Sequence, residues 1–135
     1  MIVDTGPFVA TANLKDPDHH ACSKVFADAI GKLYVPAMVV AEATYMIEKS
    51  GGPRAEAAFL RSLRSDKYVI EAPTKDDLRR AAELVELYDD LPLGGTDASV
   101  VALSERLKDN TIFTLDRRHF SVVRPLDSVA FTLLP

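Results

Sequence analysis

Short apolar runs alternate along this chain with longer stretches of helical pattern, and that alternation restricts the fold more than any other feature. The runs cover residues 2–3, 33–35, 68–70 and 111–114, and a fifth is expected over 129–132. Runs this short and apolar are typical of strands buried on both faces of a sheet. Strands that alternate with helices form βαβ units. The sequence therefore predicts an α/β fold, a three-layer α/β/α sandwich around a central, mainly parallel sheet of four to five strands.

The intervals between the runs carry start and stop signals for helices. Asp16 followed by Pro17 indicates a helix start, and Gly31 indicates its end. Thr74, with Asp77 three residues later, resembles a capping box. The helices expected are residues 6–14, 17–30, 37–49, 53–64, 75–88 and 96–107. The apolar side chains expected to face the core from the first, second and fourth of these helices are Phe8, Val9, Ala12, Leu14, Ala21, Val25, Phe26, Ala29, Ile30, Ala57, Phe59, Leu60 and Leu63.

The composition is that of an ordinary soluble globular protein. With 135 residues, 47% hydrophobic and 27% charged, the chain is expected to be a single domain, 1–135, with a sizeable core. Its one cysteine, Cys22, excludes an internal disulfide and is expected to be a small buried residue. A reducing, cytoplasmic location fits, since no secretory signal or membrane-spanning run is visible. His19 and His20 are adjacent, point to different faces and make a poor zinc pair.

Asp4 is the only charged residue before Lys15, and it follows the first apolar run directly. In open α/β sheets the carboxyl ends of the strands are where ligands bind. A carboxylate carried into apolar surroundings needs a hydrogen bond, a counter-charge or a metal to offset its desolvation. The simpler alternative is that Asp4 caps the next helix, with Pro7 in its first turn.

Three further carboxylates are isolated in the same way. Glu42 is the only charged residue between Leu33 and Ile47, Asp97 the only one between Leu91 and Ser104, and Asp116 follows the run 111–115. Each has an ordinary explanation. Glu42 could reach water from the border of a buried face, and Asp116 could cap a turn ahead of Arg117 and pair with it. Asp97 could lie in the first turn of a helix, where the helix dipole favours an acid. Together these explanations are weaker, because acids at strand ends converge on one edge of a parallel sheet.

Converging carboxylates repel one another unless a cation neutralises them, and an all-oxygen set suits Mg²⁺ or Mn²⁺. The formal charge of −4 supports the same interpretation, because removing the four acids leaves the rest of the chain neutral. Local basic patches are then possible. Arg117, Arg118 and His119 follow Asp116 and could meet phosphate at the rim of the site, although an ordinary solvated turn explains them equally well.

These motifs resemble the PIN domain and, more narrowly, the VapC-type toxins of bacterial toxin–antitoxin pairs. The resemblance rests on Val3-Asp4-Thr5, the lone Glu42, Gly94-Gly95-Thr96-Asp97-Ala98, and Thr114-Leu115-Asp116-Arg117-Arg118-His119-Phe120, and it covers essentially the whole chain. The last two motifs are fairly specific, whereas Asp-Thr alone is weak.

The resemblance implies a metal-dependent endoribonuclease that cleaves single-stranded RNA by metal-activated water. Its implied catalytic residues are Asp4, Glu42, Asp97 and Asp116, of which Asp4, Asp97 and Asp116 would hold Mg²⁺ or Mn²⁺. Glu42 would orient or deprotonate the water or complete a second ion's shell. Thr5, Thr114 and Arg117 are the implied substrate-binding residues. An antitoxin protein and a second copy of the chain are the implied partners.

Three other interpretations use the same residues. Asp4-Thr5-Gly6 also occurs in aspartic proteases, but those need a β-rich chain. A haloacid-dehalogenase-type phosphatase requires a second aspartate where this chain has Gly6. A non-catalytic single-stranded nucleic-acid-binding domain would need exposed stacking aromatics, but there is no Trp and most Phe and Tyr occupy core-like positions.

Overall fold

Five short parallel strands form the centre of the computed structural model, which describes residues 1–126 and 130–135. Their order across the sheet is β3-β2-β1-β4-β5, and every neighbouring pair is parallel. The bounds are β1 (Ile2–Val3), β2 (Leu33–Pro36), β3 (Tyr68–Glu71), β4 (Thr111–Phe113) and β5 (Thr132–Leu134). The predicted parallel sheet and α/β class are confirmed.

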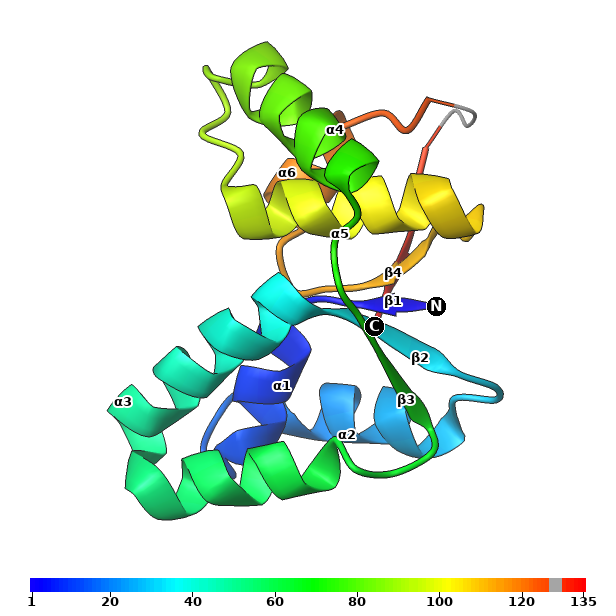
Figure 1. Ribbon diagram of the computed structural model, residues 1–135. Helices are drawn as coiled ribbons and strands as arrows, with labels where there is room; N and C mark the ends of the chain where they lie inside the picture. The colour runs from blue at the N-terminus through cyan, green and yellow to red at the C-terminus, as the bar shows by residue number, and fades with distance from the viewer. Residues whose placement is uncertain (127–129) are drawn as a thin grey trace.

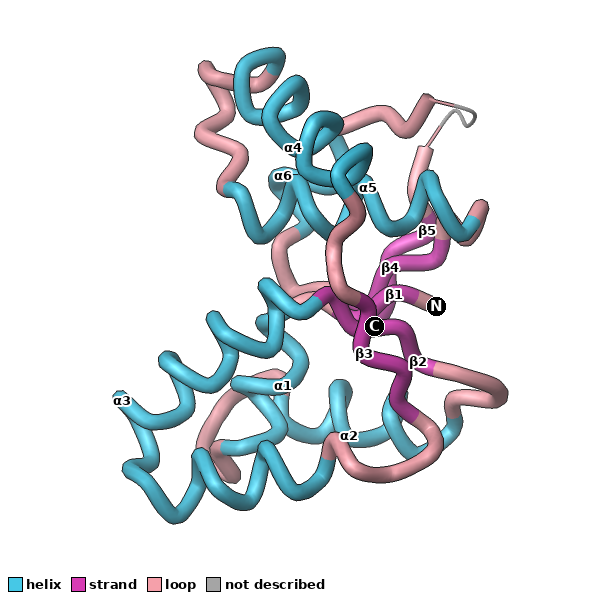
Figure 2. Tube along the Cα trace, in the orientation of Figure 1, coloured by secondary structure: helices cyan, strands magenta, loops and turns pink. Residues whose placement is uncertain are grey.

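Helices cover both faces of this sheet, which gives the three predicted layers (Figure 1). One layer holds α1 (Thr5–Ala12), α2 (His19–Asp28) and α3 (Ala37–Ser62). The other holds α4 (Lys75–Leu87), α5 (Gly95–Leu107) and α6 (Arg117–Val122). The strands lie between the layers (Figure 2). No helix among the described residues is both long and apolar enough to cross a bilayer.

The two layers bury different kinds of side chain against the sheet. Below it, Phe8 stacks on Phe26 with ring centroids 5.2 Å apart, and Phe26 meets Phe113 of β4 at 4.8 Å. Above it, α5 is buried continuously from Ala98 to Ser104 because it lies between the sheet and α4. A helix enclosed in this way fixes the residues in its first turn, including Asp97.

Helix α3 bends sharply at Gly52, whose φ of 73° and ψ of −176° are not helical. A positive φ favours glycine, so the two helices predicted over 37–49 and 53–64 are confirmed as two segments joined at this residue. The capping box of α4 is also confirmed: Thr74 accepts from the backbone N–H of Asp77, whose carboxylate accepts from Thr74. Cys22 is fully buried, as expected.

Some expected core positions are wrong. Leu14 is 84% exposed and Ile30 is fully exposed, because α1 ends at Ala12 and α2 ends at Asp28. The start of α2 lies later than expected because Asp16 closes a turn, its carboxylate accepting the N–H of Asp18. Ala12, Ala21 and Leu60 are likewise exposed.

The fifth strand lies further along the chain than predicted. β5 begins at Thr132, which pairs with Thr111 of β4, whereas the sequence predicts a strand over 129–132; Val129 lies outside the described residues. Phe131 instead packs its ring against Phe120 of α6, with centroids 6.1 Å apart. Phe131 therefore packs on α6 and is not part of β5.

Candidate metal centre at the carboxyl edge of the sheet

The strand order changes direction beside β1, and this is where the isolated carboxylates lie. β1 pairs with β2 on one side and with β4 on the other. The chain leaves β1 towards β2 and leaves β4 towards β5, so these two neighbouring strands connect to opposite sides of the sheet. Such a switch point leaves a crevice at the carboxyl edge. An open cleft of about 640 Å³ occupies it, lined by Asp4, Thr5, Gly6, Glu42, Met46, Asp97, Leu115, Asp116, Arg117 and Arg118. The structure thus places all four predicted acids around one cleft.

Asp4 is the most deeply buried of the four, with 4% of its surface exposed. Its Oδ2 accepts from Thr114 Oγ1 at 2.7 Å, but its buried Oδ1 has no hydrogen-bond partner in the described part of the chain. Although Asp4 stands at the N-cap position of α1, its side chain makes no capping hydrogen bond. Burial raises the pKa of Asp4 to about 6; the Thr114 hydroxyl and, through a weaker contact, the backbone N–H of Thr5 oppose that rise, and the charges of Asp97 and Glu42 add to it. The simple capping alternative therefore does not account for this residue.

Thr114 joins two of the acids from a completely buried position. Besides donating to Asp4, its hydroxyl accepts from the backbone N–H of Asp116 at 2.9 Å. The sequence predicts Thr114 beside the substrate, but burial keeps it from the cleft, so it acts by holding Asp4 and the chain before α6. Thr5 is also buried and donates through Oγ1 to Glu42 Oε2 at 2.5 Å.

The two carboxylate oxygens of Asp116 make different contacts. Oδ1 accepts from the backbone N–H of His119 at 3.0 Å and so caps α6, as one alternative predicted. Oδ2 lies 2.9 Å from His119 Nδ1. Arg117 does not pair with Asp116; its guanidinium donates to the carbonyl oxygen of Pro135.

Asp97 approaches the same histidine from α5. Its Oδ2 lies 3.1 Å from His119 Nδ1, and burial raises the pKa of Asp97, an effect that His119 opposes and Asp116 and Glu42 reinforce. Single atoms of Asp97, Asp116 and His119 all lie within 4.8 Å of one another. Glu42 is outside this group: it is exposed on α3 and contributes to the cleft wall.

The donor set fits a divalent cation. Buried carboxylate oxygens normally have a hydrogen-bond partner, and the unpartnered Oδ1 of Asp4 is an exception that a cation would satisfy. Asp97 and Asp116 add oxygens, and His119 adds a nitrogen. The sequence places His119 on the basic rim and does not predict it among the possible ligands. Its spacing of three residues after a capping aspartate is the signal that could have placed it. The group of possible ligands found in the described residues includes neither His19 nor His20.

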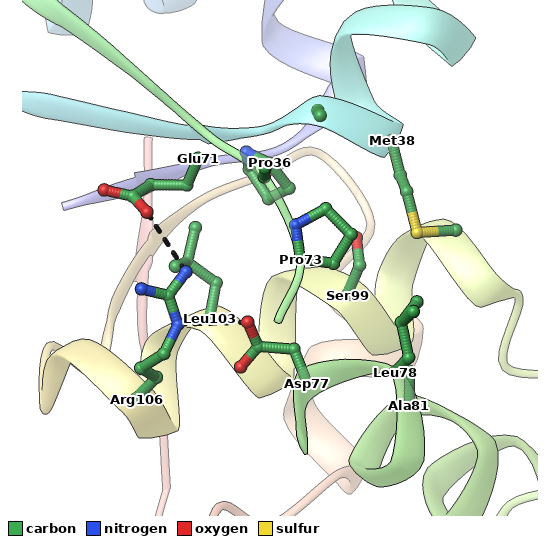
Figure 3. Close-up of a pocket in the computed structure, with 12 residues that line it drawn as sticks. Pro36, Met38, Glu71, Pro73, Asp77, Leu78, Ala81, Ser99, Leu103 and Arg106 are labelled. Atoms are coloured by element: carbon green, nitrogen blue, oxygen red, sulfur yellow. Dashed lines mark hydrogen bonds and ion pairs between the residues drawn. The ribbon is translucent and has the colours of Figure 1, made fainter. Parts of the chain in front are cut away.

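A second pocket lies beside the ends of β2 and β3, and it has a different character (Figure 3). Pro36, Met38, Pro73 and Leu78 line it, and its volume of about 10 Å³ admits at most one water. Arg106 closes it by donating to Glu71 at 3.1 Å and to Asp77 at 3.0 Å. Its charged groups are therefore satisfied by one another and not aimed at a ligand.

Known proteins resemble this chain in both sequence and structure. The PIN domain family model matches residues 1–125. Ribonuclease VapC26 of Mycobacterium tuberculosis is 37% identical over 135 residues, which is the full length of both chains. The crystal structure of M. tuberculosis VapC20, a toxin that cleaves the sarcin–ricin loop, superposes with a TM-score of 0.81 at 22% identity, covering 86% of this chain and 89% of that one. At that identity the superposition shows the fold alone.

Proposed function

The chain belongs to the PIN domain family, and we propose that it is a metal-dependent endoribonuclease of the VapC toxin type that cleaves single-stranded RNA. The observation that carries this proposal is the convergence of Asp4, Glu42, Asp97 and Asp116 on one cleft, with a buried carboxylate oxygen of Asp4 left without a partner. The full-length likeness to ribonuclease VapC26 supports the reaction class.

Asp4, Asp97 and Asp116 are the proposed cation ligands. When bound, Mg²⁺ or Mn²⁺ supplies a water of lowered pKa and stabilises the charge that develops on the phosphate. The protein holds the ligands in advance: Thr114 fixes Asp4, and the cap of α6 fixes Asp116. Ligands fixed before the cation binds lose little conformational freedom when it does.

Glu42 is the proposed group that positions the attacking water. Its Oε2 accepts from the Thr5 hydroxyl, so the carboxylate has a defined direction, and Oε1, for which the described residues show no hydrogen bond, is the oxygen proposed to accept a proton. Because water and not the 2′-hydroxyl of the RNA attacks, the products should carry 5′-phosphate and 3′-hydroxyl ends. Arg117 and Arg118, both exposed on the cleft wall, are the proposed phosphate contacts.

The toxin role brings further proposals. By likeness to the VapC proteins, a cognate antitoxin should bind this chain and block the cleft, the chain should form a homodimer, and it should act in the cytoplasm. Growth arrest on expression, relieved by a small protein encoded beside the gene, would test the antitoxin. Size-exclusion chromatography with light scattering would test the dimer.

One experiment tests the central proposal. Purified protein is incubated with end-labelled single-stranded RNA in Mg²⁺, in Mn²⁺ or in EDTA, and the product ends are mapped. Cleavage in either metal, none in EDTA, and 5′-phosphate products are expected. Tight RNA binding that survives EDTA without turnover in any metal would favour the alternative, a non-catalytic single-stranded nucleic-acid-binding domain.

A further inference from the structure

We propose that His119 is a nitrogen ligand of the cation site and that it makes the site prefer Mn²⁺, or a later divalent transition-metal ion, over Mg²⁺. This inference rests on the proposed function, because it uses the same acidic cleft. It goes beyond that function by adding a ligand of a different chemical type and by naming the class of ion that the site selects.

The distances around His119 are those of neighbouring ligands on one ion. Its Nδ1 lies 2.9 Å from Asp116 Oδ2 and 3.1 Å from Asp97 Oδ2. Adjacent ligands held at about 2.1 Å from a six-coordinate ion are separated by about 3.0 Å. The nitrogen therefore has the spacing of a neighbouring ligand from both oxygens, and the ligand atoms of the three residues all lie within 4.8 Å of one another.

Hydrogen bonding does not explain the same contacts. His119 Nδ1 is buried, and it makes no aligned hydrogen bond with any described residue despite the two nearby oxygens. Contacts of 2.9 and 3.1 Å that are not hydrogen bonds are explained either by charge or by a shared cation. Among the described residues, Asp4, which is 4% exposed, has the other buried side-chain atom without a partner, and it lines the cleft together with Asp97 and Asp116. The unpartnered Asp4 oxygen thus faces a cleft lined by Asp97 and Asp116, and these are the two acids that His119 contacts.

The position of the imidazole is set by the backbone. His119 is the third residue of α6, and its own N–H donates to Asp116 Oδ1, the oxygen that does not face the ring. The cap therefore fixes both groups at once: one oxygen of Asp116 holds the helix, and the other lies beside the ring. The side chain of His119 is 16% exposed, so water competes little for its Nδ1.

A nitrogen ligand changes the choice of ion. Mg²⁺ prefers hard oxygen ligands and binds imidazole poorly, whereas imidazole suits transition-metal ions, whose affinity for such a site rises from Mn²⁺ to Cu²⁺. Three carboxylates alone would suit Mg²⁺ and Mn²⁺ alike. A set containing His119 should discriminate against Mg²⁺.

The competing explanation is that His119 serves only as a positive charge that neutralises Asp97 and Asp116. A point charge would weaken every divalent ion alike and leave no nitrogen in its coordination shell. A ligand role predicts that His119 affects Mn²⁺ and Mg²⁺ binding unequally and that a nitrogen lies in the coordination shell of the bound ion. The two explanations therefore differ in metal selectivity and in spectroscopy, without reference to RNA cleavage.

The test compares wild type, His119→Gln and the matched control His20→Gln, which changes an exposed histidine of α2. Mn²⁺ and Mg²⁺ dissociation constants are measured by titration calorimetry at neutral pH, and the Mn²⁺ complex is examined by pulsed electron paramagnetic resonance for ¹⁴N coupling. Imidazole coupling is expected in wild type and His20→Gln and should be lost in His119→Gln. The ratio of the Mg²⁺ to the Mn²⁺ dissociation constant should fall about tenfold or more in His119→Gln, which is the scale of the affinity losses seen when groups around a metal are changed.

The outcomes separate this inference from the proposed function. Mn²⁺ binding without ¹⁴N coupling in wild type overturns the role of His119 and leaves the nuclease proposal standing, and this measurement needs no variant to fold. An unchanged ratio of Mg²⁺ to Mn²⁺ affinity in a folded His119→Gln protein also overturns it. If neither ion binds wild type at all, the metal-dependent function fails together with the inference.

Discussion

Two buried aspartates on the same edge of the sheet have opposite surroundings. Asp77, 8% exposed, accepts from the backbone N–H of Thr74 at 2.8 Å and from Arg106 Nε at 3.0 Å. Asp4, 4% exposed, accepts from the Thr114 hydroxyl and keeps one oxygen unpartnered, with other carboxylates as its nearest charges. Burial alone thus does not separate a structural acid from a functional one. What separates them is whether the protein itself supplies the compensating charge.

The comparison also explains why one region is closed and the other open. Around Asp77, Arg106 links α5 to both α4 and β3, and the remaining pocket admits at most one water (Figure 3). Around Asp4, like charges face a cleft of about 640 Å³. Buried charges without a partner are costly, so the second arrangement is stable only if a cation is present or if some acids are protonated.

The largest difference should appear in RNA cleavage. Asp4→Asn and Asp97→Asn should each lower the rate at least a thousandfold, about 4 kcal/mol of transition-state stabilisation, because an amide keeps the shape but loses the charge that binds the cation. Asp77→Asn should stay within about tenfold of wild type. Single-turnover rates on labelled RNA, with circular dichroism to confirm folding, make the comparison. A rate within tenfold of wild type for Asp4→Asn or Asp97→Asn would remove that residue from the principal ligands.

Stability without metal should change in opposite directions at the two sites. Because the pKa of Asp4 is raised from 3.8 to about 6 in the folded protein, the native state binds more protons than the unfolded state between those pH values. Its contribution to stability is therefore lost as pH rises through about 6, by roughly 3 kcal/mol at most. In EDTA at pH 7, Asp4→Asn should be more stable than wild type and less pH-dependent over this range.

Asp77→Asn should instead destabilise by about 1–3 kcal/mol, since Arg106 loses one of its two charged partners. Urea unfolding of the three proteins at pH 4 to 8 in EDTA measures both effects. Destabilisation by both substitutions at pH 7 would mean that Asp4, like Asp77, is compensated within the protein.

A cation should stabilise the protein only through the cleft around Asp4, and not through the region around Asp77. At about a hundred times its dissociation constant, Mn²⁺ should add roughly 2.7 kcal/mol to the unfolding free energy of wild type. Asp77→Asn should gain the same amount, and Asp97→Asn much less at the same concentration. Thermal melts with Mn²⁺ and with EDTA are sufficient. Equal gains in wild type and Asp97→Asn would show that the ion binds elsewhere.

The smallest effects should come from the threonines that hold the two aspartates. Thr114→Val leaves Asp4 Oδ2 and the N–H of Asp116 without partners, so it should lower both stability, by about 1–3 kcal/mol, and cleavage, by about tenfold. Thr74→Ala removes only a helix cap and should cost about 1 kcal/mol of stability. The RNA cleavage rate of the Thr74→Ala protein should be unchanged. If Thr114→Val lowers stability and leaves the rate intact, Thr114 has no part in positioning the site.

Much of the site was predictable because the acids are isolated in apolar sequence. Asp4, Glu42, Asp97 and Asp116 could be selected on that ground, and the parallel sheet brought them to one edge. His119 was not selected, because its neighbours Arg117 and Arg118 made the segment resemble a basic turn. Its role depends on α6, a helix too short for periodicity to reveal.

The errors in the fold have a common physical origin. Leu14 and Ile30 continue apolar patterns beyond the points at which their helices end, and periodicity does not mark those ends. The strand predicted over 129–132 is displaced because Phe131 packs on Phe120. In each case a contact or turn formed elsewhere in the chain decides the boundary.

The hydrogen bond from Thr114 to Asp4 joins residues 110 positions apart, and Thr114 is itself held by its N–H bond to the carbonyl oxygen of Leu134. A contact this distant in sequence carries a large loop-closure entropy and slows folding. During synthesis, Asp4 is made long before Thr114, so its carboxylate cannot yet accept the hydrogen bond from the Thr114 hydroxyl. The centre can therefore assemble only after residues near the carboxyl end of the chain have joined the sheet.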